Sequence, residues 1–424
     1  MIPARPLAAV LAAAALTAAC VGNPKVYDDS VRAAQVMDGG GTAGVADESA
    51  AQARAVLAGY QVASLSPGQR PAASTVEAGL WMQIDRVTNR MQSAGNRVTD
   101  PALNAYVAGV VCRVAGEYCN SVRTYVLRQP AFNAAMYPNG VMEVWSGLLL
   151  RVRNEAQLAA VVGHEVGHYL RRHSLQRFEK IRDATNGLVF FQVVTAMAGV
   201  GIVGNVAALA TIGGLQAYSR DNEREADGYG LVLMGRAGYD PREAAKVWAN
   251  IQRETDASDN ARGSLFAASH PPSDERQREL ARLAPAVTVA TGDDPLGRER
   301  FLAAVAPHRM AFLRDEIKKR TFKPTMAMLE GLLEDGDRPA EIHYAIGELY
   351  RIRGDDGDGE KALDSYAKAL ADGDAPAAVH RSVGLVHRKA GRQDEARAAF
   401  ARYLELTPQA EDAAMIRFMI QGGS

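Results

Sequence analysis

The chain has 424 residues, of which 23% are charged and 47% are hydrophobic, and its formal net charge is −1 at pH 7. This length and composition predict a globular protein with room for two or three domains. The near-zero charge gives no electrostatic basis for binding nucleic acid, so that class of function is excluded.

The first residues carry the pattern of an export signal. Arg5 is followed by an apolar, alanine-rich segment from Leu7 to Ala19, and Cys20 comes directly after it. A segment of this length is too short for a stable membrane span but suits a secretory signal. We therefore predict a signal peptide over residues 1–19.

Cys20 resembles the processed cysteine of bacterial lipoproteins, although Thr17 stands where that pattern prefers leucine. A lipid on Cys20 would anchor the chain to a membrane. Val21, rather than aspartate, follows the cysteine, which by the same resemblance implies the outer membrane. The predicted location is the bacterial periplasm, with the chain attached to the outer membrane as a lipoprotein. A plain secretion signal with an incidental cysteine is the alternative.

A linker and then a helical domain follow the signal. Residues 20–75 are rich in Ala, Gly, Ser and Gln and contain few aromatic residues, which predicts a flexible tether. A folded domain is expected over residues 76–290. Within it, Thr99-Asp100-Pro101 predicts the start of a helix, since proline is favoured in the first turn and apolar residues follow at helical spacing.

Cys112 and Cys119 are the only cysteines besides Cys20, and in an oxidising compartment they form a candidate disulfide. On one continuous helix they would be about 10.5 Å apart along the axis, beyond the reach of a disulfide. Gly116 can end the helix between them and let them meet. A pair of free, partly buried thiols is the alternative.

The segment from Val161 to Leu170 places the pattern H-E-x-x-H in an otherwise apolar helical run. His164 and His168 share one helix face, so both can bind one zinc ion at roughly 2.0–2.1 Å. Glu165 lies about 100° around the helix, where it can reach a water on the metal and act as a general base. Three unpartnered ionisable groups would be costly to bury without a metal, which favours this interpretation over an ordinary exposed helix.

A catalytic zinc usually has a third protein ligand and an open position for water. His173 lies about 140° from the face of His168 and is expected on the helix flank, in a supporting or structural position. Downstream, Glu223 and Asp227 stand four apart on one helical face, so one can ligate while the other orients an imidazole. Asp227 suits the orienting task. Glu225 is expected to point to the other side.

Residues 187–219 contain no charged residue and are long enough to span a bilayer, but polar residues and glycines interrupt the segment. A single span would put Glu223 on the opposite side of the membrane from His164 and destroy the zinc site. We therefore expect a buried or membrane-facing hairpin of a soluble domain. Two helices that dip together toward lipid are the alternative.

An internal repeat of small and large residues occupies the C-terminal part of the chain. Ala362 and Tyr366 precede Ala396 and Phe400 by roughly 34 residues, the length of a tetratricopeptide repeat. In such a repeat, small residues let two helices approach and large residues fill the space between them. We predict a helical tetratricopeptide solenoid over residues 298–424.

These segments together resemble the zinc metallopeptidase family of the CAAX prenyl endopeptidases and HtpX, and in particular the BepA-like periplasmic proteases with C-terminal tetratricopeptide repeats. The match covers roughly residues 76–285 in the family's order. The matching segments are Asn133-Ala134, Pro138-Asn139-Gly140, Gly147-Leu148-Leu149, His164 to His168 with His173, Ser219 to Asp227, and His270-Pro271-Pro272 with Arg276.

The resemblance implies one zinc ion per chain, bound by His164, His168 and Glu223, with Glu165 as general base. The implied fold class is mainly α with a small β-sheet. It consists of a gluzincin-type zinc metalloprotease domain followed by the tetratricopeptide solenoid.

The resemblance also implies that His270 and Arg276 face the metal from a late loop. An extended substrate is expected to add as a β-strand to an edge formed by the strand near residues 136–144.

Two roles compete for His270 on this resemblance. As a fourth zinc ligand it would displace the catalytic water and repress the enzyme, whereas as an N–H donor beside Arg276 it would stabilise the oxyanion of the tetrahedral intermediate. The repressing role is favoured in the resting state, because an unregulated protease endangers its neighbours. A loop histidine far from the metal is the alternative.

The predicted function is that of a lipid-anchored periplasmic zinc metalloendopeptidase for quality control of outer-membrane and envelope proteins. Resemblance to the BepA-like proteases implies extended or misfolded envelope proteins as substrates and the outer-membrane β-barrel assembly machinery as a partner of the repeats. One alternative is a chaperone or scaffold for outer-membrane protein assembly with a normally repressed zinc site. Another is an integral-membrane protease in which residues 187–219 insert.

Overall fold

The computed structural model describes residues 42–61, 63–92, 94–184, 218–258, 270 and 274–421. The predicted signal peptide and Cys20 lie outside these residues, as does nearly all of the segment 187–219. The chain divides into the units Met1–Ala46 and Asp47–Ser424, and the second contains the core and the candidate site. Within the described part of the chain, no helix combines the length and the apolar character that crossing a bilayer requires.

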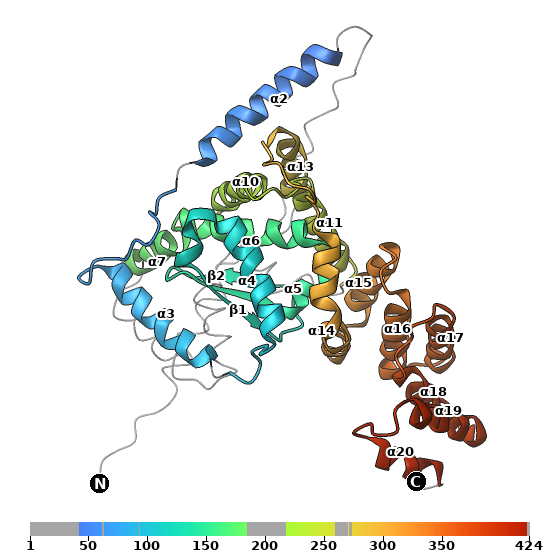
Figure 1. Ribbon diagram of the computed structural model, residues 1–424. Coiled ribbons are helices and arrows are strands. Elements are labelled where there is room, and N and C mark those ends of the chain that lie inside the picture. The colour runs from blue at the N-terminus through green and yellow to red at the C-terminus, as the bar shows by residue number, and fades with distance from the viewer. Residues whose placement is uncertain are drawn as a thin grey trace, which may run out of the picture. The chain divides into compact units, whose positions relative to one another are not determined.

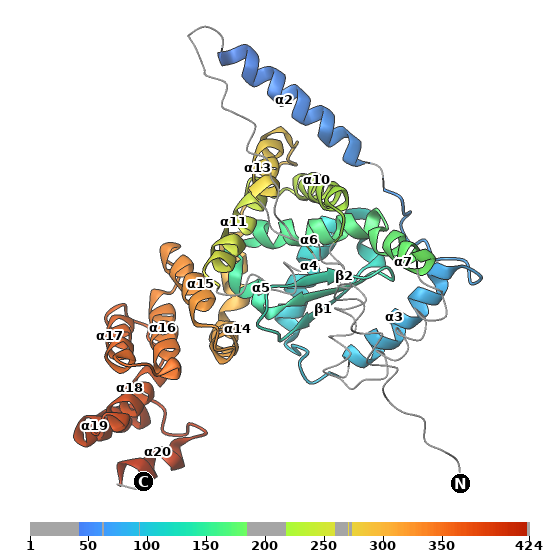
Figure 2. The same cartoon turned by 180° about the vertical axis from the view of Figure 1, so that it is seen from behind.

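Helices make up most of the described chain (Figures 1 and 2), which confirms a mainly α fold with a small sheet. Short 3-10 helices lie at Gly59–Gln61 (η2), Gly116–Ser121 (η3) and Ala284–Ala286 (η4). The α-helices are α2 Thr42–Ala58, α3 Val76–Gln92, α4 Pro101–Ala115, α5 Ser146–Arg151, α6 Glu155–Leu170, α7 His173–Ala184, α10 Arg220–Arg236, α11 Glu243–Asp256, α13 Asp274–Leu283, α14 Arg298–Lys318, α15 Phe322–Glu334, α16 Pro339–Arg353, α17 Asp358–Ala371, α18 Ala378–Lys389, α19 Gln393–Leu406 and α20 Ala413–Ile420.

The sheet has three short strands in the order β1 (Arg123–Leu127), β3 (Val141–Trp145) and β2 (Ala134–Met136). β1 is parallel to β3, and β2 is antiparallel to β3. All residues of β3 are buried, as expected of a central strand. The prediction of one edge strand near residues 136–144 is therefore wrong, because that range contains two strands and only β2 lies at an edge.

A tight hairpin between β2 and β3 explains the difference. The N–H of Gly140 donates to the carbonyl oxygen of Tyr137 at 2.9 Å, which closes the turn. Gly140 has a φ of +80°, and a Cβ at this position would lie 2.0 Å from the carbonyl oxygen of Ser121. Asn139-Gly140 is a strong hairpin signal that the sequence prediction did not use.

The predicted helix start at Asp100 is confirmed. Asp100 caps α4, with its Oδ1 accepting the N–H of Leu103 at 2.7 Å. The helix ends at Gly116, whose φ of +57° leads the chain into η3. Because of this turn, the Cα atoms of Cys112 and Cys119 lie 4.5 Å apart and the two cysteines form a disulfide.

Residues 42–65 differ from the flexible tether predicted over residues 20–75. They contain α2 and η2, and the side chains of Leu57 and Leu65 are buried. The N–H of Ser64 donates to the carbonyl oxygen of Leu170 at 3.0 Å, which attaches this segment to the end of α6. An alanine-rich composition suits a tether, but alanine is also the strongest helix former, and that preference prevails here.

One hydrophobic core joins the sheet to the surrounding helices. It contains Val110 of α4 and Val144 of β3, and it continues into α14, α15 and α16 through Phe312, Leu329 and Ile342. The boundary predicted between residues 290 and 298 therefore does not coincide with a break in packing. Composition changes there, but the first helices after the boundary bury their apolar faces against the preceding domain.

Buried ion pairs cross the same boundary. Arg151 of α5 is 4% exposed, and its Nε lies 2.8 Å from a Glu254 oxygen while its Nη2 lies 3.0 Å from Glu316 of α14. Because removing one partner would leave the others charged and buried, these contacts fix α14 against α5 and α11.

Beyond α15 the chain forms two pairs of consecutive helices, α16 with α17 and α18 with α19, followed by α20. A Cβ on Gly347 would lie 2.3 Å from the ring of Tyr366, and a Cβ on Gly384 would lie 2.5 Å from the ring of Phe400. Both rings are fully buried. The pairing of small and large residues expected for the repeat is thus present in both helix pairs, while the tetratricopeptide assignment itself stays a prediction.

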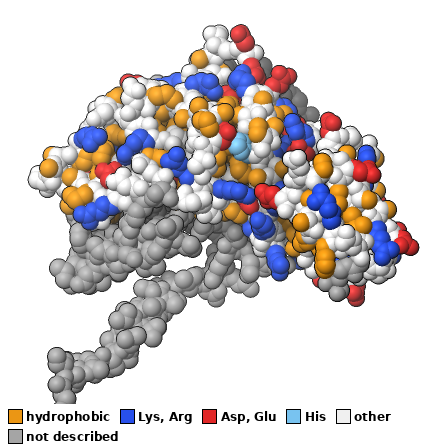
Figure 3. All heavy atoms as spheres, turned by 60° about the horizontal axis from the view of Figure 1, so that its bottom comes forward, with side chains coloured by type: hydrophobic (Ala, Val, Ile, Leu, Met, Phe, Trp, Pro, Cys, Tyr) orange, Lys and Arg blue, Asp and Glu red, His pale blue; other side chains and the backbone are white. Residues whose placement is uncertain are grey.

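The face of the molecule in Figure 3 mixes basic, acidic and hydrophobic side chains. Charges of opposite sign lie close together on this face, as a formal net charge of −1 leads one to expect.

Candidate functional site

Helix α6 supplies the first two candidate ligands. It begins after Asn154, whose side chain accepts the N–H of Gln157 at 2.8 Å, and it is buried along almost its whole length. His164 and His168 lie one turn apart on this helix with exposed fractions of 2% and 1%. They share one face, since their Nε2 atoms are 3.1 Å apart.

Helix α10 supplies two carboxylates and lies beside α6 (Figures 1 and 2). Ser219 caps α10 by accepting the N–H of Asn222 at 3.2 Å. Glu223 and Asp227 follow one turn apart, and both are buried. The spacing of four therefore directs both carboxylates toward α6, as the sequence predicts.

Three glycines allow α6 and α10 to approach closely. A Cβ on Gly163 would lie 3.0 Å from the carbonyl oxygen of Gly230, and a Cβ on Gly230 would lie 3.0 Å from the nitrogen of His164. A Cβ on Gly167 would lie 3.0 Å from the carbonyl oxygen of Ala226. A side chain at any of these positions would push the helices apart, and their separation sets the distance between Glu223 and the two histidines.

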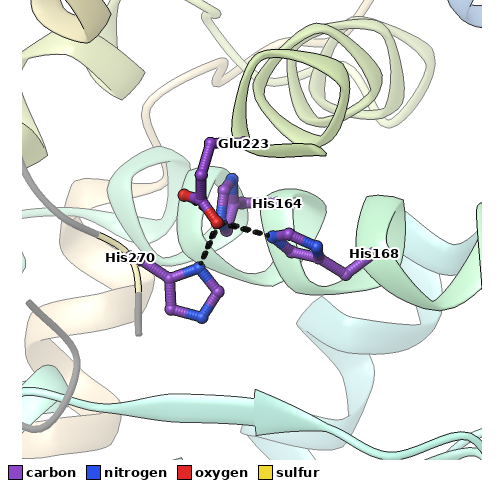
Figure 4. Close-up of side chains that lie close together, drawn as sticks. All are labelled: His164, His168, Glu223 and His270. Carbon is purple, nitrogen blue, oxygen red and sulfur yellow. Dashed lines mark hydrogen bonds and ion pairs between the residues drawn. The ribbon is translucent and has the colours of Figure 1, made fainter. Parts of the chain in front are cut away.

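Four donor groups converge at this contact (Figure 4): His164, His168, Glu223 and His270, whose donor atoms all lie within 4.8 Å of one another. His270 Nδ1 is 3.1 Å from His164 Nε2 and 3.0 Å from Glu223 Oε1. The Glu223 carboxylate is 3.4 Å from His168 Nε2 and 3.6 Å from His164 Nε2. His270 lies four residues before the first residue of α13 and is 4% exposed.

These separations fit a zinc ion. Four ligands at 2.0–2.1 Å in a tetrahedron lie about 3.3–3.4 Å from one another, close to the spacing of the donor atoms observed here. Three imidazoles and a carboxylate are also ligand types that zinc prefers. Burial alone would raise the pKa of Glu223, but the neighbouring His270, His168 and His164 hold this pKa well below its usual range and favour the anionic ligand.

Glu165 lies beside the four donor groups but is not one of them. Its Oε2 accepts the N–H of Met136 at 3.2 Å, and its Oε1 is 3.5 Å from His270 Nε2. The carboxylate is 3% exposed, and burial raises its pKa. A buried carboxylate with a raised pKa beside a metal centre has the properties of a general base.

Asp227 orients the ring of His164. Its Oδ1 lies 2.9 Å from His164 Nδ1, which leaves Nε2 of that ring for a metal. Arg276 of α13 donates to both oxygens of Asp227 at 2.8 Å, and its Nη1 lies 2.7 Å from Glu223 Oε2. Burial alone would raise the pKa of Asp227, but Arg276 keeps this pKa below its usual value.

The resemblance implies that Arg276 faces the metal from a late loop, whereas the structure places this residue on α13. Its guanidinium contacts the two carboxylates of α10 and lies 4.2 Å over the ring of Trp248. It positions Glu223, a candidate ligand, and it also positions Asp227, which orients the candidate ligand His164. The sequence places it in the right segment, but the direction of a long side chain depends on packing that no local pattern records.

At its Nδ1, the ring of His168 contacts a second histidine instead of a carboxylate. Its Nδ1 lies 2.9 Å from His173 Nδ1, and His173 Nε2 lies 2.8 Å from Glu225 Oε2. Burial lowers the pKa of both His168 and His173, which favours neutral imidazoles. The carboxylate of Glu225, which is expected to point to the other side of its helix from Glu223, meets His173, and His173 directly follows a turn of the chain at Arg172, with a φ of +57°.

Sequence reasoning missed two aromatic residues of the site and a buried carboxylate in the central strand. The ring of Tyr218 stacks on His168 with centroids 4.1 Å apart, and the ring of Trp248 lies 5.8 Å from His164. Glu143 of β3 is a buried carboxylate that accepts the O–H of Tyr137 at 3.1 Å. An acidic residue in a central strand is unusual enough to have been noticed, whereas the two aromatic residues carry no local signal.

Comparison with known proteins agrees with this geometry. Residues 98–284 match the model of peptidase family M48. The chain is 34% identical over 168 residues to the mitochondrial metalloendopeptidase OMA1 of Schizosaccharomyces pombe, covering 39% of the chain and 47% of the relative.

Two bacterial relatives share the name beta-barrel assembly-enhancing protease. The one from Escherichia coli is 27% identical over 183 residues, 40% of the chain and 37% of the relative. The one from Yersinia pestis is 24% identical over 305 residues, 65% of the chain and 61% of the relative. The aligned stretch thus spans less than two thirds of each of these relatives.

The contact between α6 and α10 can be tested with Gly230→Leu. The added side chain should separate the helices, lower the free energy of unfolding by about 1–3 kcal/mol and weaken metal binding. Gly109→Leu on α4 is the control, since no described atom lies within 4 Å of a Cβ there. Urea unfolding and metal analysis of the purified chains give the comparison, and equal stability and metal content in both variants would contradict the proposed constraint.

Proposed function

We propose that the chain is a zinc-dependent metalloendopeptidase, because its residues 98–284 match peptidase family M48. The observation that carries the proposal is the buried convergence of His164, His168, Glu223 and His270 with Glu165 beside them. A bound metal ion explains why three imidazoles and a carboxylate converge at one point in a protein interior.

His164, His168 and Glu223 would hold the zinc ion. When bound, zinc would polarise the scissile carbonyl and lower the pKa of a water molecule. Asp227 keeps His164 in the tautomer that offers Nε2, and Arg276 holds Asp227 and Glu223 in place.

Glu165 would transfer the proton. Its carboxylate would take a proton from the attacking water and then deliver it to the amine that leaves. The N–H of Met136 fixes one of its oxygens, so the other oxygen, at 3.5 Å from His270, is the one that faces the reaction. Its raised pKa suits a group that must first accept and then release a proton.

Substrate would bind as an extended strand along β2. This three-residue strand lies at the edge of the sheet, and its last residue, Met136, contacts Glu165. A peptide that adds to this edge would therefore have its backbone next to the base. This proposal keeps the predicted mode of binding and moves it to the strand that is at the edge.

His270 would repress the resting enzyme. Its Nδ1 lies 3.1 Å from His164 Nε2 and 3.0 Å from Glu223 Oε1, which is close to the spacing expected of a fourth zinc ligand. In that position it would exclude the water that the reaction requires. An oxyanion donor beside Arg276 is less well supported, because Arg276 is turned toward the carboxylates of α10.

The proposed location is the bacterial periplasm, with a lipid on Cys20 attaching the chain to the outer membrane. The proposed substrates are misfolded or extended envelope proteins. Two relatives named beta-barrel assembly-enhancing protease support this choice of substrate class.

The helices from residue 298 onward would act as a tetratricopeptide module that contacts the outer-membrane β-barrel assembly machinery. The equivalent packing of Gly347 on Tyr366 and Gly384 on Phe400 supports the repeat. Continuity of the core with α14–α16 means that this module would be fixed to the peptidase domain rather than tethered to it.

A chaperone or scaffold for outer-membrane protein assembly is the alternative function, and the position of His270 favours it. A site held closed by four protein donors would leave the repeats as the active part of the molecule. The two functions differ in their dependence on Glu165. A chain without this base would keep the scaffold function in cells and lose the protease function.

Glu165→Gln should keep one zinc ion per chain and lower peptidase turnover by about 10²–10⁴, because the ligands remain while the proton acceptor is lost. Elemental analysis and cleavage of an unstructured protein measure the two effects. Glu117→Gln in η3, at an exposed position away from the site, is the matched control. Full turnover in the Glu165 variant would contradict the proposed mechanism.

His270→Ala should raise basal peptidase turnover and self-cleavage while zinc is retained, because the fourth position opens to water. His308→Ala on α14, where the histidine lies near Asp100 and far from the metal ligands in the sequence, is the control. Turnover reduced by on the order of 10² with zinc retained would instead establish an oxyanion role. Unchanged turnover would rule out both roles.

A further inference from the structure

We propose that His173, Glu225 and Arg171 form a positioning chain that fixes the tautomer and the orientation of His168, the second histidine of the zinc site. This inference rests on the proposed function, because it assumes that His168 Nε2 binds the metal. It gives a definite role to His173, for which the sequence predicts only a supporting or structural position, and it adds Glu225 and Arg171. It also accounts for a histidine at a position where a carboxylate or carbonyl usually supports a ligand.

The chain is a continuous series of polar contacts. His168 Nδ1 lies 2.9 Å from His173 Nδ1, His173 Nε2 lies 2.8 Å from Glu225 Oε2, and Arg171 Nε donates to Glu225 Oε1 at 2.7 Å. His168 and His173 are each 1% exposed, while the side chains of Glu225 and Arg171 are 28% exposed. The contacts thus lead from the buried metal site to the surface.

Only one arrangement of protons satisfies all of these contacts. A neutral imidazole that offers Nε2 to zinc carries its proton on Nδ1, so His168 must donate to His173. His173 Nδ1 is then the acceptor, and the proton of that ring is on Nε2, which donates to Glu225. Glu225 is an acceptor on both oxygens, one toward His173 and one toward Arg171, as a carboxylate requires.

The two zinc-binding histidines are therefore supported in different ways. His164 contacts a carboxylate, Asp227, directly at 2.9 Å. His168 contacts a neutral ring that in turn contacts a carboxylate, so the negative charge of Glu225 is one residue farther from the metal. Each series ends at an arginine, Arg276 in one case and Arg171 in the other.

A purely structural role is the competing explanation. His173 is the first residue of α7, so its contacts could simply attach that helix to α6. The two explanations differ in whether His173 affects metal binding. A positioning chain affects the strength and the geometry of metal binding, whereas an attachment affects only the stability of the fold.

The experiment compares the affinity of purified full-length variants for Zn²⁺, measured by competition with a chromophoric chelator, and the visible spectrum of the Co²⁺-substituted protein. His173→Ala should weaken Zn²⁺ binding by about 10–100-fold and change the Co²⁺ spectrum. His173→Asn should recover part of the affinity, since the amide oxygen can take the place of Nδ1 as acceptor. Glu225→Ala should have a smaller effect in the same direction.

Glu77→Ala is the control, because it removes the ion pair of Glu77 with Arg172 at the same turn without touching His168. Its Zn²⁺ affinity should equal that of the unmodified protein. Unaltered Zn²⁺ affinity in His173→Ala, or an equal loss in His173→Asn and His173→Ala, would overturn the positioning chain. If His173→Ala does not fold, Glu225→Ala and His173→Asn decide. Absence of Zn²⁺ binding in the unmodified protein would instead overturn the proposed function.

Discussion

The close packing of α6 on α10 is the constraint on which the rest of the site depends. Helix α6 supplies His164 and His168 and helix α10 supplies Glu223, so these three proposed ligands come together only when the two helices pack. Gly163 and Gly230 bring the two backbones so close that a Cβ at either position would lie 3.0 Å from the opposite helix, tighter than an ordinary contact. Overpacked interiors respond by shifting backbone, and a shift of a few tenths of an ångström here would separate Glu223 from the histidines of α6.

Charge explains why this contact needs a cation. Glu165, Glu223 and Asp227 place three carboxylates in the buried site, and Arg276 places one guanidinium against two of them. Unbalanced charge in a protein interior is costly, and a divalent ion would neutralise it. The Nε2 atoms of His164 and His168 lie 3.1 Å apart, and the same ion would bind both of them.

The sequence shows which residues share a face of one helix, but it does not show how side chains on different elements point toward one another. Four-residue spacing placed His164 with His168 and Glu223 with Asp227, because both pairs lie on regular helices. The prediction of the edge strand was wrong because a turn at Gly140 divides the segment, and the contact between Glu225 and His173 was not predicted because it depends on a turn at Arg172. Long side chains such as that of Arg276, and aromatic neighbours contributed by distant elements, depend on tertiary packing that leaves no local pattern.

Zinc K-edge X-ray absorption on the purified full-length protein is the most direct test of the central claim. We expect one zinc ion per chain with four nitrogen or oxygen ligands at about 2.0–2.1 Å, three of them imidazoles when His270 closes the site. Failure of the protein to retain stoichiometric zinc, or a spectrum with sulfur ligands, would contradict the assignment of the metal to His164, His168 and Glu223.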